Sequence, residues 1–275
     1  MDRQAAQGIT TTAYSRPQPP PKAQNEWREL LVSPTPPPSV INPPKTPGPE
    51  FEITLAPAPN NYSRLLPSLS SRYAALLPTT GSTIEISPEA RTTTTLLSQM
   101  IGGTAGSQAS AATGLFNTNL RKSAPSGAAL IVDYGPSSSI PISTLRGIRS
   151  HQRCSPFTSP GSVDLSADVD FGGLVETALS SSEGVEVHGP VEQADWLASM
   201  GGQERCDTLI RTAGIREGTG TEGNSDEVAK RISSGWERLV DRGINGMGKL
   251  YKVMAIVPES GGKRKPVGFG GDVDA

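Results

Sequence analysis

The chain has 275 residues, enough for one domain or two, and 30 of them are Gly and 25 Pro. Only 35% are apolar, which excludes a uniformly packed globule and predicts that part of the chain is loop or disordered. The net charge of −2 gives no basis for binding nucleic acid or an anionic membrane, because such surfaces need clustered Lys and Arg in excess.

Cysteine and histidine are scarce, which limits the chemistry of the chain. Two cysteines, Cys154 and Cys206, cannot form a disulfide framework, and with His151 and His188 they provide no closely spaced set of metal ligands. No apolar run approaches the roughly 20 residues that a bilayer-spanning helix needs. The sequence therefore predicts neither a metal site nor a membrane span.

The N-terminal region is rich in proline, with 12 of the 25 prolines in the first 50 residues. We expect residues 1–24 to be disordered. Residues 27–32 and 51–55 alternate polar and apolar side chains and predict two strands of a hairpin, with a Pro-rich insertion over 33–50 between them. A plain linker is the main interpretation of that insertion, and a ligand for a proline-recognising module is the alternative.

A capped helix is the clearest element of the next region. Ser87 before Pro88 is an N-cap followed by proline at the first helical position, and it predicts a helix as far as Ile101 that Gly102 and Gly103 close. The neighbouring segments predict helical turns over 60–80, a short strand over 83–86 and a Ser/Gly-rich insertion over 103–126.

Residues 127–134 form a continuous apolar run that ends in Asp133 and Tyr134, before Gly135. The pattern predicts a fully buried parallel strand, and α/β sheets bind their ligands at the carboxyl ends of such strands. Asp133 and Tyr134 are therefore candidate site residues. The alternative is that Asp133 caps nearby backbone and Tyr134 lies at the edge of the core.

Residues 163–171 alternate, so a strand there would carry Asp164, Ser166, Asp168 and Asp170 on one face. Three carboxylates on one face repel each other unless a cation or water meets them. A guanidinium substrate, an internal arginine from the cluster Arg146, Arg149 and Arg153, or simple exposure would each satisfy them. Asp170 has the alternative role of N-cap for a helix over 171–179.

The remaining pattern is typical of an α/β fold. It predicts strands over 185–188 and 250–257, helices over 191–200, 203–213 and 226–241, and a disordered tail over 258–275. A Gly-x-Ser-x-Gly nucleophile and a glycine-rich phosphate loop between strand and helix are both missing from the sequence. The residues alone thus point neither to a hydrolase nor to a nucleotide-like cofactor.

Several segments nevertheless match one family in the same order along the chain. They are residues 27–32, 51–57, 84–90, 129–135, 145–147 with His151, 160–171, and 189–191 with Gln193, Leu197, Met200, Gly201 and Arg205. In these segments the chain resembles the mitochondrial protein arginine methyltransferases that assist assembly of respiratory complex I, together with their MidA-type bacterial relatives. The resemblance runs from about residue 27 to residue 257, interrupted by the insertions.

The resemblance implies an S-adenosylmethionine-dependent enzyme of the Rossmann-like class I methyltransferases, which dimethylates an arginine of a complex I subunit symmetrically in the mitochondrial matrix. The glycine-rich loop of this family is not found in the sequence. The expected fold is therefore α/β, a partial Rossmann-like sheet with helical additions over 25–257, in which the N-terminal cofactor half is missing. We expect the chain alone to be inactive.

For the site, the resemblance assigns substrate-side roles but no cofactor-binding residue. Asp133, Tyr134, Asp168 and Asp170, with Glu85 in addition, are expected to orient a guanidinium group through charge-assisted hydrogen bonds. Two competing hypotheses are an assembly protein that binds the complex I subunit without catalysis, and a non-functional fragment.

Overall fold

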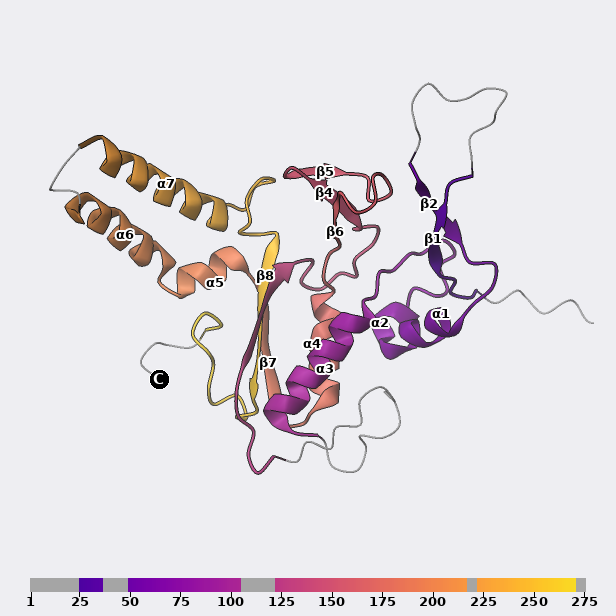
Figure 1. The fold of residues 1–275 in the computed structure, drawn as a ribbon. Coiled ribbons are helices and arrows are strands. Elements are labelled where there is room, and N and C mark those ends of the chain that lie inside the picture. Colours follow the sequence, from indigo (N-terminus) through magenta and orange to yellow (C-terminus); the bar gives the residue numbers. More distant parts are fainter. Residues whose placement is uncertain (1–24, 37–48, 105–121, 217–221, 271–275) are drawn as a thin grey trace, which may run out of the picture.

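The computed structural model describes residues 25–36, 49–104, 122–216 and 222–270 (Figure 1). The predicted disorder over residues 1–24, most of the two predicted insertions and the end of the predicted tail lie outside the described residues.

The central sheet has three strands in the order β3–β8–β7, which are β3 (Ala129–Tyr134), β8 (Tyr251–Pro258) and β7 (Val185–Glu192). The last strand of the chain, β8, lies in the middle and is antiparallel to both neighbours. Its buried run explains this position, since a strand flanked on both sides needs apolar side chains on both faces. The sequence predicted this strand and β7, although β7 is twice as long as expected.

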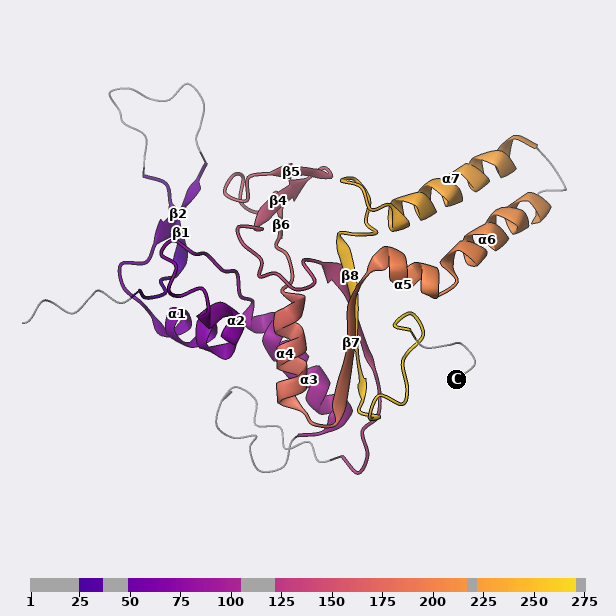
Figure 2. The same ribbon diagram turned by 180° about the vertical axis from the view of Figure 1, so that it is seen from behind.

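Two helices cover one face of this sheet (Figures 1 and 2). Helix α3 (Pro88–Gly102) begins with the predicted cap, because the Ser87 side chain accepts a hydrogen bond from the Ala90 N–H. Helix α4 (Phe171–Ser181) begins at Asp170, whose side chain accepts from the Gly173 N–H, as its predicted capping role requires. Between helices and sheet lies the main core, made by Ile101, Phe171, Leu174, Ala178, Val185, Met254 and Ile256.

Strand β3 departs from its prediction in orientation and in burial. It is antiparallel to β8, not parallel to a neighbour, and alternate side chains are exposed, with Leu130 at 53% and Val132 at 46%. The reason is that α3 and α4 cover only the face with Ile131, whereas nothing in the described chain covers Leu130 and Val132. The apolar run is typical of a strand buried on both faces, and here one face is open.

A second body of elements lies to one side of α3 and α4, where the predicted hairpin forms from β1 (Leu30–Pro34) and β2 (Phe51–Leu55). The helical turns expected after it are α1 (Asn61–Leu65), a 3-10 turn η1 (Leu66–Leu69) and α2 (Ser71–Ala74). A small antiparallel sheet, in the order β5–β4–β6, lies above the end of β3 and consists of β4 (Arg146–Arg149), β5 (Gln152–Cys154) and β6 (Asp164–Ser166).

Three further helices project from the opposite side in both views (Figures 1 and 2). They correspond to the three predicted ones and are α5 (Gln193–Ser199), α6 (Gly202–Arg216) and α7 (Glu222–Val240). Cys206 is buried, as its place on an apolar stripe predicted, whereas Met200 is 47% exposed and not inward as expected. None of the helices among the described residues is long and apolar enough to cross a membrane.

Two predicted strands are wrong in the described chain. Residues 83–86 form no strand: the Glu85 N–H donates to the carbonyl of Pro141, and a proline has no N–H with which to return the bond. The strand expected over 163–171 stops at Ser166, because the N–H of Asp168 turns to the Thr144 hydroxyl and that of Val169 to the Tyr134 carbonyl. Asp168 and Asp170 therefore do not share a strand face with Asp164.

The segment after β8 follows a defined course over residues 259–270, where the sequence suggested a disordered tail. The ring of Phe269 lies 6.2 Å from that of His188 on β7. Gly268 lies so close to Trp196 that a Cβ there would come within 2.5 Å of the indole nitrogen. This segment therefore covers the face of β7 and β8 that α3 and α4 leave open.

The contact between α3 and the start of β7 depends on a glycine. A Cβ on Gly184 would lie 2.3 Å from the carbonyl oxygen of Gly102. We expect Gly184→Ala to lower the free energy of unfolding by about 1–3 kcal/mol, because the helix end must move out of the core. Gly235→Ala, at an open and exposed position of α7, is the matched control and should be neutral or stabilising. Urea denaturation measures both, and equal stability of the two variants would contradict the packing argument.

Candidate functional site

The predicted site residues lie around the end of β3 but fall into separate environments. Tyr134, Asp168 and Glu85 are linked by hydrogen bonds and ring contacts through the small sheet. Asp170 belongs to a second cluster between α2 and α4. Asp133 points to the opposite face of β3 from Tyr134, because successive side chains of a strand alternate.

The first group, here called the Tyr134 cluster, comprises Tyr134, Arg146, Ser166, Asp168 and Tyr251. The Arg146 guanidinium lies over the Tyr134 ring, with Cζ 4.6 Å from the ring centroid, and its Nη1 donates to Asp168 Oδ1 at 2.7 Å. The Tyr134 hydroxyl is hydrogen-bonded to that of Ser166, and the Tyr251 ring stands perpendicular to the Tyr134 ring at 5.5 Å. A cation, its carboxylate and an aromatic face are thus brought together at the strand end.

Glu85 acts on this cluster through Thr144. Its carboxylate accepts hydrogen bonds from the Thr144 N–H at 2.8 Å and from the Thr144 hydroxyl. The same hydroxyl accepts from the Asp168 N–H at 2.9 Å. Glu85 therefore fixes the backbone that carries Arg146 and Asp168, which is a positioning role and not direct contact with the Tyr134 ring.

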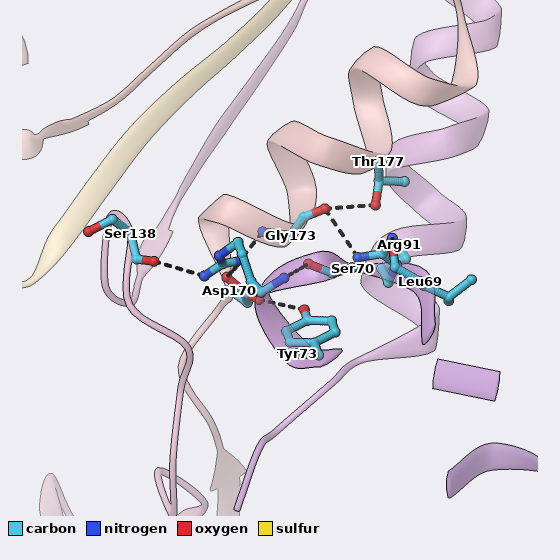
Figure 3. Close-up of polar contacts among 9 residues, drawn as sticks. Leu69, Ser70, Tyr73, Arg91, Ser138, Asp170, Gly173 and Thr177 are labelled. Carbon is cyan, nitrogen blue, oxygen red and sulfur yellow. Dashed lines mark hydrogen bonds and ion pairs between the residues drawn. The ribbon is translucent and has the colours of Figure 1, made fainter. Parts of the chain in front are cut away.

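The second group, here called the Asp170 cluster, comprises Arg72, Tyr73 and Asp170 together with the backbone of Ser138 and Gly173 (Figure 3). Arg72 Nη1 donates to both carboxylate oxygens of Asp170 at 3.0 and 3.1 Å. The Tyr73 hydroxyl donates to Oδ2 at 2.5 Å, and the Gly173 N–H donates to Oδ1. One carboxylate thus caps α4 and holds α2 against it.

Burial of Tyr73, which is 1% exposed, and its hydrogen bond to the Asp170 carboxylate raise the pKa of its hydroxyl. The hydroxyl therefore stays protonated and remains a donor. On the other side of α4, Arg91 donates to the carbonyl of Gly173 at 3.3 Å and to that of Leu69 at 3.5 Å. Every link of the Asp170 cluster joins elements of the fold, as in a structural brace.

On the helix-covered face of the sheet, Asp133 lies in register with Lys252 of β8, which is in turn in register with Glu192 of β7. The Asp133 carboxylate accepts a hydrogen bond from the Tyr134 N–H at 2.8 Å, so the alternative of a carboxylate capping nearby backbone describes its contact. Lys252 is only 7% exposed, and burial lowers the pKa of its ammonium group. An acidic, basic and acidic row crosses the sheet at this level.

Two internal arginines meet the two carboxylates for which the sequence left three partners open. Arg146, which belongs to the arginine cluster that the sequence singled out, pairs with Asp168. Arg72, which the sequence analysis missed, pairs with Asp170. The two residues of that second pair are 98 positions apart in a segment of short helical turns, and no local pattern connects them.

Comparison with known proteins identifies the family. Residues 21–191, more than half of the chain, match a family described as "Putative S-adenosyl-L-methionine-dependent methyltransferase". The chain belongs to this family. It contains no group of three or more His, Cys, Asp or Glu side chains within the described residues that could hold a metal ion.

Individual relatives carry a more specific name. The Drosophila melanogaster "Protein arginine methyltransferase NDUFAF7 homolog, mitochondrial" is 36% identical over 132 residues, 48% of this chain and 27% of that protein. The Xenopus laevis protein of the corresponding name is 34% identical over 134 residues, 49% of this chain and 27% of its own length. The Homo sapiens protein is 30% identical over 132 residues, 48% and 26% respectively. The chain thus matches about a quarter of the length of these relatives.

The described residues at the end of β3 do not fit the cofactor that the family name implies. The Gly135 N–H, the first backbone donor after the strand, donates to the Leu250 carbonyl at 3.3 Å. A Cβ on Gly135 would lie 2.2 Å from the Val169 carbonyl oxygen, so the chain itself fills the space beside this turn. A cofactor cradle needs free donors and open space, and this turn offers neither.

The Asp170 cluster gives a direct test of its bracing role. Asp170→Asn keeps an oxygen that can cap α4 but removes the charge that pairs with Arg72 and accepts from Tyr73. We expect a loss of about 1–3 kcal/mol in the free energy of unfolding. Asp164→Asn, at an exposed position of β6, is the control and should change stability by less than about 0.5 kcal/mol. Thermal melting compares them, and a loss of similar size in both would show that the charge of Asp170 holds nothing together.

Proposed function

We propose that this chain is the substrate-side part of an S-adenosylmethionine-dependent protein arginine methyltransferase, and that a further polypeptide carrying the cofactor site completes it. The observation that carries the proposal is the open side of β3. Its outer edge pairs with no strand of the described chain, and the exposed Leu130 and Val132 lie beside that edge. An edge strand with apolar side chains on its open face is a surface made for a further strand.

The position of this edge favours a Rossmann-like sheet that continues beyond β3. In such sheets ligands bind at the carboxyl ends of the strands, at the point where strand order changes. The Tyr134 cluster lies at the carboxyl end of β3, between the described sheet and the proposed continuation. A cofactor held by the added part would thus come close to the polar groups that this chain supplies.

The groups at the strand end suit an arginine as substrate. Asp168 and Asp170 are carboxylates that already bind guanidinium groups of the chain, and Tyr134 provides an aromatic face. The proposal extends to the roles expected from the resemblance: symmetric dimethylation of an arginine of a complex I subunit in the mitochondrial matrix, with Glu85 and Asp133 as supporting carboxylates. The names of the relatives favour a mitochondrial location.

A second candidate is a non-catalytic protein that binds the complex I subunit during assembly. It is favoured by the internal pairing of Asp168 and Asp170, which leaves both carboxylates engaged by the chain itself. The two candidates differ in what happens when the missing part is added, since only the first gains methyl transfer.

The test uses the whole chain, after circular dichroism confirms that it folds. Titration with S-adenosylmethionine in a calorimeter should show no binding in the micromolar range, because β3 has no cofactor cradle beside it. Mixing the chain with the N-terminal part of the human relative should produce cofactor binding and methyl transfer to an arginine peptide. Micromolar binding by the chain alone would contradict the proposed division of the site, and binding without transfer in the mixture would favour the assembly protein.

A further inference from the structure

We infer that Tyr134, Ser166 and Asp168 form a guanidinium-binding site that the chain's own Arg146 occupies, and that a substrate arginine enters by displacing it. The inference rests on the proposed function for its substrate class. It adds to that function a self-occupied site, in which an internal arginine holds the place of the external one.

The contacts of Arg146 are those by which proteins recognise a guanidinium group. Its plane lies over an aromatic ring at 4.6 Å, and a carboxylate oxygen of Asp168 lies 2.7 Å from its terminal nitrogen. Ring stacking selects a flat, weakly hydrated cation, and the carboxylate provides a charge-assisted acceptor. The combination discriminates arginine from lysine, whose ammonium group is compact and strongly hydrated.

The walls of this site are held by contacts that do not involve Arg146. The Tyr134 hydroxyl is hydrogen-bonded to Ser166, and Tyr251 supports the ring edge-on. The backbone of Asp168 is fixed by Thr144, which Glu85 binds in turn. Because the ring and the carboxylate are positioned independently, the site should keep its shape when the side chain of Arg146 leaves.

Arg146 is also placed so that it can leave. Its side chain is 14% exposed and that of Asp168 is 20% exposed, so the pair lies within reach of solvent. Its printed partners, Asp168 and the Thr144 carbonyl, both accept from the same nitrogen, Nη1. Arg72 in the Asp170 cluster contrasts with it, because two nitrogens engage there and the guanidinium closes onto the buried Tyr73. The Tyr134 cluster is therefore the exchangeable site and the Asp170 cluster the fixed one.

The experiment removes the internal arginine and offers an external one. We expect Arg146→Ala to bind N-acetyl-arginine-N-methylamide about tenfold more tightly than the unmodified chain, because the site is then vacant. The matching lysine compound should bind more weakly than the arginine compound to the same variant. Arg149→Ala, which removes an exposed arginine from the same strand, is the control and should behave as the unmodified chain. Adding Asp168→Asn to Arg146→Ala should abolish the gain.

A folded Arg146→Ala variant that binds the arginine compound no better than the unmodified chain would overturn the inference. Should this variant fold poorly, methylguanidinium in the buffer should raise its melting temperature more than that of the Arg149→Ala control, and equal shifts would also overturn it. No cofactor is present in either measurement. Failure here is thus distinguishable from failure of the proposed function, which appears as missing cofactor binding and methyl transfer in the completed enzyme.

Discussion

The antiparallel insertion of β8 between β3 and β7 is the constraint on which the rest of the structure depends. It places the most buried strand of the chain at the centre of the sheet and gives α3 and α4 one apolar face to cover. It also leaves β3 at the border, with one edge and part of one face open. The core and the open edge are therefore two consequences of one strand order.

This arrangement explains why the polar groups gather where they do. The chain leaves β3 at Tyr134, and the small sheet β5–β4–β6 lies above that end, so Arg146 and Asp168 reach the Tyr134 ring. On the other side Asp170 begins α4 and binds α2, which fixes the turn between the two clusters. One pair of neighbouring carboxylates thus serves two tasks, because Asp168 meets an accessible arginine and Asp170 a closed one.

Much of the local structure could be predicted from the sequence, because its signals are local. Ser87 and Pro88 begin α3, Asp170 caps α4, and alternation places β1 and β2 in a hairpin. The orientation and burial of β3 could not be predicted in this way, because an apolar run does not reveal whether both faces are covered. For the site, the strand-end position drew attention to Tyr134 and Asp168, and Arg146 was among the possible partners. Arg72 and Tyr73 were missed because their link to Asp170 spans almost a hundred residues and leaves no pattern in sequence.

The central claim is that the free edge of β3 receives the rest of a methyltransferase domain. Hydrogen–deuterium exchange of the chain, alone and mixed with the N-terminal part of the human relative, tests it most directly. The account predicts that amides within residues 129–134 that do not face β8 exchange at least about tenfold more slowly in the mixture, because a new strand bonds to them. The amides of β7 should be unchanged. Unaltered exchange at β3, or protection confined to the β1–β2 hairpin, would contradict the claim.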